Sequence, residues 1–476
     1  MGKKINRILL DCSETYIENL NTGIQRAVKN IVQRSEKISK KYDIPIIPII
    51  LDSKNGYVDL RFFINQKNNF SDAGDNKNKQ KKFIKKILKE KFKLKETDDI
   101  FKFSKFLWHL MKRFKYWLIG IRRMYRSSLL PSAKAVLPQE GDLLILLDGF
   151  WGYRYNNYFT LFCRHIKKKG GIITAVMYDI IPLTNPEFFE KELTMRFKSK
   201  FNALKNSIDI IMTISKNESE NIKNYLKENF KIENKKISYF DLGCDFADKS
   251  KESKENKDTE NSGGIIRKDL IEIIETMKTM KTMETVNPPM PSKKLYLMVG
   301  TIEPRKGYDY TLEAFEELWS GGFTGVLVIA GKIGWDVEEV IKKIGSSAYV
   351  NKNLFVFNDL NDEELDFLYN KADAAICASK REGFSLPMAE AAFYGVKVLA
   401  SDIPVFREIG EKYTVFSYFN PQKADLVEAI KEFENKTVKT VKTVNEFSDK
   451  DDFNFVKWNQ SVDAFFSKIF TLCETL

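Results

Sequence analysis

The sequence predicts an α/β protein built from two doubly wound domains that face a cleft. Apolar strands alternate with amphipathic helices through both halves of the 476-residue chain, the pattern of mostly parallel sheets that are buried on both faces. A low-complexity stretch at 247–293 separates the two alternating units. Because 43% of the residues are hydrophobic, the chain can form two sizeable cores.

The alternating pattern also sets the expected domain boundaries. The first domain is predicted to span residues 1–246, with an insert at 65–135, and the second to span 294–435. Residues 436–476 combine a second repetitive segment with a C-terminal helix, which we expect to return to the first domain. The two repetitive segments, TMKTMKTMET and KTVKTVKTV, are interpreted as tolerated expansions of a flexible linker and of the C-terminal region.

Cysteine usage and hydropathy suggest where the protein works. The five cysteines are scattered and form no CxxC pair, which favours free thiols in a reducing compartment over disulfides or a metal site. The sequence shows no signal peptide and no apolar run of about 18 residues. We therefore expect a cytoplasmic protein, either free or peripheral on the inner face of the plasma membrane.

The net charge of +12 comes from one segment of the insert. Residues 77–135 contain 19 Lys or Arg and 4 Asp or Glu. Their excess of positive charge is therefore larger than the net charge of the whole chain. Apolar residues recur at helical spacing along 101–126, with the cations largely off that stripe. Two interpretations stay open: a helix that binds an anionic membrane surface, or a helix packed on the first domain. Nucleic-acid binding is disfavoured, because no recognised module accompanies the charge.

The segment EGFSLPMAE, from Glu382 to Glu390, is the strongest indication of a site. It follows a predicted buried strand and opens a predicted helix, with Pro387 in the first helical turn. In a parallel sheet, ligands bind beyond the carboxyl ends of the strands, and a helix N-terminus there attracts anions. Two carboxylates at this place suit hydroxyl groups of a sugar or a ribose.

Several patches resemble the family 4 glycosyltransferases, which are retaining enzymes of the GT-B fold. In the second half these are VGTIEPRKG (299–307), VLVIAGKIGW (326–335), EGFSLPMAEAAFYGVKVLASD (382–402) and PVFREIG (404–410). The first half adds NTGIQRAVKNI (21–31), YDIIPLTNPEF (178–188), TISKNESENI (213–222) and DLGCD (241–245). The EPRKG patch resembles a subgroup associated with mannosyl transfer in bacterial surface polysaccharides.

The resemblance implies a nucleotide-sugar donor, such as a GDP- or UDP-sugar, and no metal or other cofactor. Arg305 and Lys306 would bind the diphosphate, on which negative charge grows as the glycosidic bond breaks. Glu382 would lie near the donor sugar and Glu390 on the ribose. The other residues implied in donor binding are Gly23, Gly383, Phe384, Ser385 and Leu386.

The first domain would bind the acceptor, a glycan that many relatives carry on a lipid. Gly23 to Arg26 are expected to form a loop that faces the cleft; a helix start capped by Thr22 is compatible with the same contact. Asp148, Trp151 and Tyr178 are expected on the same side. Many relatives have His-Asp where this chain has Tyr178-Asp179, and a tyrosine supplies no group that titrates near pH 7. Asp179 is a candidate for acceptor binding or base-like assistance.

The sequence thus predicts a retaining, metal-independent hexosyltransferase, with mannose favoured, in bacterial surface polysaccharide biosynthesis. The alternative is a catalytically silent protein that binds glycans or nucleotides on the same scaffold. Tyr178 keeps this alternative open, because the histidine it replaces helps to bind the donor sugar in relatives.

Overall fold

The computed structural model describes most of both predicted domains. The described residues are 4–18, 22–52, 56–61, 135–152, 157–245, 266–268, 270–273, 275, 293–413, 415–435 and 455–476. The predicted amphipathic helix at 101–126 and both repetitive segments lie outside them. In the described part of the chain, no helix combines the length and the apolar character needed to cross a membrane.

The N-terminal domain is built on a seven-stranded sheet in the order β3-β2-β1-β4-β5-β6-β7. All neighbouring strands are parallel except β2 and β3, which are antiparallel. The interior strands are almost uniformly apolar, as expected for a sheet covered on both faces. The strands are β1 (Arg7–Asp11), β2 (Ile46–Asp52), β3 (Gly56–Asp59), β4 (Asp142–Leu146), β5 (Ile172–Met177), β6 (Ile210–Thr213) and β7 (Lys236–Tyr239).

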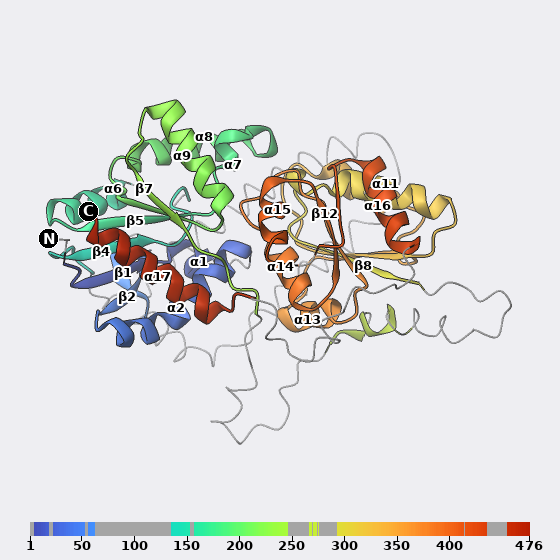
Figure 1. Ribbon diagram of the computed structural model, residues 1–476, viewed down its shortest axis with the longest axis horizontal. Helices are drawn as coiled ribbons and strands as arrows, with labels where there is room; N and C mark the ends of the chain where they lie inside the picture. Colours follow the sequence, from blue (N-terminus) through green and yellow to red (C-terminus); the bar gives the residue numbers. More distant parts are fainter. Residues whose placement is uncertain are drawn as a thin grey trace, which may run out of the picture.

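Helices cover both faces of this sheet (Figure 1). They are α1 (Ser13–Glu18), α2 (Gly23–Tyr42), α6 (Asn157–Lys168), α7 (Ile181–Thr184), α8 (Lys191–Leu204) and α9 (Lys216–Phe230). Gly23 to Arg26 are the first turn of α2, which confirms the helix start capped by Thr22 and not the loop. Thr22, in extended conformation, is the N-cap residue of this helix, a position that favours threonine.

The C-terminal domain has a six-stranded parallel sheet in the order β10-β9-β8-β11-β12-β13. Its strands are β8 (Leu295–Val299), β9 (Val326–Ala330), β10 (Leu354–Phe357), β11 (Ala374–Cys377), β12 (Lys397–Ser401) and β13 (Ser417–Phe419). Its helices are α11 (Tyr308–Ser320), α12 (Glu338–Ser346), α13 (Asp362–Tyr369), α14 (Leu386–Phe393), α15 (Pro404–Gly410) and α16 (Lys423–Asn435). The strand order reverses between β8 and β11, the place where doubly wound sheets bind ligands.

The last helix, α17 (Trp458–Glu474), lies on the N-terminal domain although it follows the C-terminal domain in sequence (Figure 1). It packs against α2, β6 and β7, and its buried face includes Trp458, Phe465 and Ile469. The Ser461 hydroxyl also donates to the Asp241 carbonyl at 2.6 Å. The chain therefore passes between the two domains twice.

Part of the segment expected to be a linker is packed. The described residues between 266 and 275 are largely helical, and Leu270 is buried in the core. Arg267 donates to Glu364 and to Asp359, both at 3.0 Å. This short stretch is therefore attached to the C-terminal domain beside α13.

Candidate active site

The site residues of the C-terminal domain come together where β8 and β11 end. A 3₁₀ turn, Pro304–Lys306, follows β8 and ends at Gly307, which has a φ of 76°. A β-carbon on Gly307 would lie 2.1 Å from the Ala378 carbonyl oxygen, so only glycine allows this approach. The close contact brings Arg305 and Lys306 next to the loop that carries Glu382.

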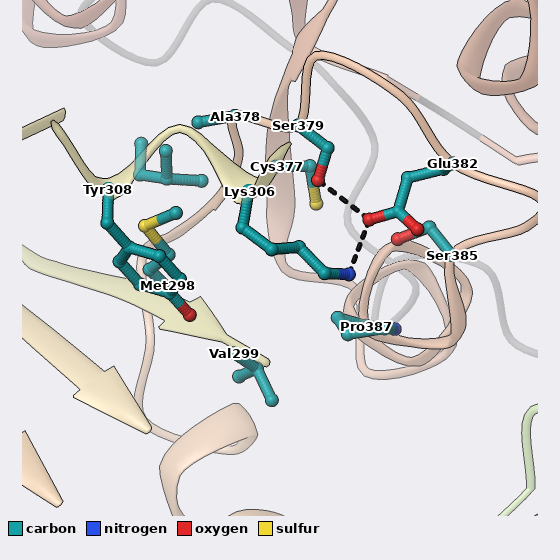
Figure 2. Close-up of a pocket in the computed structure, with 11 residues that line it drawn as sticks. Met298, Val299, Lys306, Tyr308, Cys377, Ala378, Ser379, Glu382, Ser385 and Pro387 are labelled. Carbon is teal, nitrogen blue, oxygen red and sulfur yellow. Dashed lines mark hydrogen bonds and ion pairs between the residues drawn. The ribbon is translucent and has the colours of Figure 1, made fainter. Parts of the chain in front are cut away.

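Three side chains converge on the Glu382 carboxylate. Arg305 Nη1 lies 2.5 Å from Oε2, and Lys306 forms an ion pair with Oε1. The Ser379 hydroxyl donates to Oε1 at 2.7 Å. Figure 2 shows Lys306 and Ser379 converging on the same carboxylate oxygen of Glu382. The predicted donor-site residues Arg305, Lys306 and Glu382 thus form one cluster.

Glu303 and Asp179 extend this cluster to three carboxyl groups and two cationic side chains. Glu303 Oε1 lies 2.7 Å from Arg305 Nη2. Burial would raise the pKa of Glu382, but Arg305 and Lys306 outweigh burial and hold it below its usual value. Burial raises the pKa values of Glu303 and Asp179, which the same cations offset only in part. The two cations are therefore held in place by carboxylates that compete for them.

A cavity of about 10 Å³ lies against this cluster, lined by Lys306, Tyr308, Ser379 and Glu382 among others. That volume holds about one water molecule. A nucleotide sugar is far larger, so the side chains around the cavity have to rearrange before such a ligand can bind there.

The second glutamate, Glu390, binds across the domain boundary. It lies inside α14, is buried, and pairs with Arg26 from the first turn of α2. Tyr369 donates to its other oxygen at 3.0 Å, and Arg26 also reaches Asp362 at 3.3 Å. Burial raises the pKa of Glu390 and Arg26 offsets this in part. Arg26 therefore occupies the carboxylate that the resemblance assigns to ribose.

The loop after Glu382 also touches the N-terminal domain. A β-carbon on Gly383 would lie 2.2 Å from the Tyr178 carbonyl oxygen and 2.9 Å from Asp179 Cβ. Asp179 therefore sits directly against the donor loop. Glu218 of α9 accepts from the Ile180 amide at 2.8 Å. Burial, with a contribution from Asp179, raises the pKa of Glu218 to about 8.

The remaining acceptor-side predictions fall on buried groups. Asp148 accepts from the amide and the hydroxyl of Thr15, at 2.9 and 2.6 Å. Burial raises the pKa of Asp148 to about 7. The Tyr178 hydroxyl donates to the Leu147 carbonyl at 2.9 Å, so its side chain points into the domain. Trp151 is half-buried, and its ring packs on that of Phe197 with the two ring centroids 4.6 Å apart.

The other predicted donor residues line the same boundary. Gly23 lies close to Leu386, whose Cδ1 would be 3.5 Å from a β-carbon there. Ser385 is the N-cap of α14 and accepts from the Met388 amide at 3.3 Å. Phe384 is buried in the core.

Sequence reasoning missed several residues that contact the site, namely Glu303, Asp362, Tyr369 and Ser379. Glu303 lies in the motif VGTIEPRKG, and Ser379 ends the predicted strand segment ADAAICAS (372–379). Their positions in the sequence therefore offered a signal that they lie near the site. Asp362 and Tyr369 reach Glu390 only through folding of α13 against α14, which leaves no local sequence signal.

Comparison with known proteins agrees with this architecture. Two solved structures align over almost the whole chain: the N-terminal domain of a trehalose-6-phosphate phosphatase from Candida albicans and a glycosyltransferase from Rickettsia africae. The first has a TM-score of 0.56, with 99% of this chain and 97% of that one covered. The second has a TM-score of 0.52, with 99% and 100% covered. Both are 14% identical in sequence and inform on the fold alone. The two facing domains have the GT-B fold, as the sequence predicted.

Sequence comparison adds relatives of known class to this fold assignment. Residues 281–450 match the family described as glycosyl transferases group 1. A serotype-specific mannosyltransferase WbdA from Escherichia coli is 30% identical over 302 residues, 63% of this chain and 33% of the relative. The chain thus spans about a third of the length of this curated relative. The part of the chain at 281–450 is thus similar to the group 1 glycosyltransferases, in agreement with the resemblance of its motifs.

Proposed function

We propose that the protein is a retaining hexosyltransferase that uses a nucleotide-sugar donor and acts without a metal ion. The observation that carries this proposal is the cluster of Arg305, Lys306 and Ser379 around Glu382, at the carboxyl ends of β8 and β11. Two cations there match a diphosphate, and the carboxylate matches sugar hydroxyls. Mannose is the favoured sugar, because the E. coli relative is named a mannosyltransferase.

In this proposal the donor replaces contacts that the site residues make with one another. Arg305 and Lys306 transfer part of their pairing from Glu382 to the diphosphate, and their charge stabilises the transition state more than the ground state. Glu382 is then able to accept hydrogen bonds from the sugar, while Ser379 keeps its carboxylate oriented. Glu390 exchanges Arg26 for the ribose hydroxyls.

The transfer step follows from this placement. An acceptor hydroxyl attacks the anomeric carbon on the face from which the diphosphate leaves. The new bond joins the acceptor oxygen to that carbon, the bond from carbon to phosphate oxygen breaks with its electron pair, and the acceptor proton passes to the departing phosphate oxygen. Asp179, which touches the Gly383 loop, is placed to orient the acceptor. Closure of the domains excludes water and aligns the reactants.

The acceptor is proposed to be a glycan of a surface polysaccharide, carried on a lipid. Support comes from the naming of the E. coli relative as serotype-specific and from the cationic sequence at 77–135, which suits an anionic membrane surface. Proteoliposome flotation with and without residues 77–135 tests the membrane part of the proposal. Equal flotation of both forms contradicts it.

The transfer activity is tested with Lys306→Ala and Glu382→Ala, measured as nucleoside diphosphate release from a panel of GDP-, UDP-, dTDP- and ADP-sugars. We expect release to be lost in both variants while both remain folded. The control is Glu313→Ala, which breaks the exposed Glu313–Lys343 pair elsewhere in the same domain. Normal turnover in both site variants would refute the assignment.

A catalytically silent binding protein is the second candidate, and the placement of Tyr178 is what favours it. Its hydroxyl is directed at Leu147 and not into the site, so the sugar contact that the resemblance assigns to this position is missing. Binding of nucleotide sugars in a thermal-shift screen, without nucleotide release, would support this candidate.

A further inference from the structure

The first turn of α9 is a contact point between the two domains that the donor site does not use. Glu408 of α15 accepts from the Lys216 amide through Oε1 and from the Asn217 amide through Oε2, both at 2.7 Å. Helices α15 and α9 pack against each other. A carboxylate of the C-terminal domain thus spans the start of a helix of the N-terminal domain.

The chemistry of this contact is that of a helix cap supplied by another domain. The first amides of an α-helix have no partner within the helix, and they carry partial positive charge. The hydroxyl of Ser215, the N-cap residue of α9, accepts from the Glu218 amide at 3.1 Å. Glu408 satisfies the two amides before it, with hydrogen bonds strengthened by its negative charge.

The same turn also holds the donor loop. The Ser215 hydroxyl donates to the Gly383 carbonyl at 2.7 Å while it accepts from Glu218, which one hydroxyl can do. Gly383 follows Glu382 directly and touches Asp179. The docking of α15 on α9 and the placement of the Glu382 loop against Asp179 are therefore parts of one interface.

We propose that Glu408 is a positioning residue, which docks the C-terminal domain on α9 and so sets the Glu382 loop against Asp179 when the domains close. Glu408 lies outside the cluster around Glu382, so the donor does not displace it. Arg26 differs in this respect, because its partner Glu390 belongs to the proposed donor site. The link to catalysis rests on the proposed function; the docking itself does not.

Hydrogen exchange tests the docking without any substrate. In Glu408→Gln, one carboxylate oxygen is replaced by an NH2 group, which cannot accept a hydrogen bond from a backbone N–H. Exchange in overlapping peptides that cover Lys216 and Asn217 is expected to accelerate about tenfold, the effect of losing a contact of this kind. The control is Asp402→Asn, which breaks the bidentate pair of Asp402 with Arg407 at the start of the same helix, within one domain. Unchanged exchange in Glu408→Gln would overturn the proposal.

Kinetics then separate positioning from binding and folding. We expect kcat of Glu408→Gln to fall about tenfold, with the Kd for GDP and UDP and the melting temperature close to wild type. The positioning role would be overturned if Glu408→Gln had the kcat of wild type. It would also be overturned if its affinity for GDP or UDP fell by as much as its kcat. If wild type turns over no nucleotide sugar, the proposed function fails, whereas the exchange result still decides whether Glu408 docks the domains.

Discussion

The carboxylates of the two domains are held in different ways. In the C-terminal domain, Glu382 is balanced by Arg305 and Lys306, which keep its pKa low in spite of burial. In the N-terminal domain, Asp148 is held by the amide and hydroxyl of Thr15, and its pKa rises to about 7. Ion pairs can be exchanged for a charged ligand, whereas a buried network of hydrogen bonds is part of the fold. We therefore propose donor chemistry for the cluster around Glu382 and structural support for Asp148.

The largest effect is expected from Lys306→Ala. Loss of a cation beside a developing diphosphate charge should slow transfer by about 100-fold or more in a protein that stays folded. Initial rates of nucleotide release measure this effect. Lys343→Ala, which removes the cation of an exposed pair, should leave the rate unchanged. A comparable loss in both variants would show that Lys306 has no special role.

Asp148→Ala should instead affect stability. The variant leaves the buried amide and hydroxyl of Thr15 without their acceptor, which costs roughly 3 kcal/mol in the free energy of unfolding. Denaturant titration measures this loss. Nucleotide affinity of the folded fraction should match that of wild type. A stable variant with lost transfer would instead place Asp148 in direct contact with the acceptor.

The pH dependence of stability should reveal Glu218. Its pKa rises from 4.5 to about 8 on folding, so the folded state holds a proton that the unfolded state releases above about pH 4. This stabilisation is complete below the unfolded pKa and is lost as pH rises through 8, by about 3 kcal/mol between pH 6 and 9. Denaturant titrations at several pH values should show a flatter profile for Glu218→Gln. Identical profiles would contradict the shift.

The smallest expected effect is a gain in affinity from Arg26→Gln. In the structure, Arg26 occupies Glu390, so a nucleotide has to break this pair before it binds. Removal of the pair should tighten nucleoside diphosphate binding by up to about tenfold, measured by calorimetry. Lys29→Gln, on the same helix, is the control. Weaker binding in Arg26→Gln would show instead that Arg26 contacts the bound nucleotide.

Much of the fold could be predicted from the sequence, because buried parallel strands form continuous apolar runs that are easy to recognise. The short elements α1, β3 and β13 could not, since three to six residues carry too little periodicity. The repetitive surroundings of residues 266–275 predict a linker, yet Leu270 and Arg267 attach the described part of this stretch to the C-terminal domain.

The cluster of Arg305, Lys306 and Glu382 was also predictable, because each residue lies in the loop after a strand and parallel strands end at one edge. The pairing of Arg26 with Glu390 and of Glu408 with α9 was not. Both join residues of different domains, and their contact depends on how the domains close and not on any local pattern.

The most direct test of the account is nucleotide release by wild type and by Lys306→Ala, assayed in parallel with GDP-mannose and the other nucleotide sugars. The account predicts release by wild type from at least one donor, increased by a glycan acceptor, and a loss of about 100-fold or more in the variant. Absence of binding and of release with every donor, or equal release by both proteins, would contradict it.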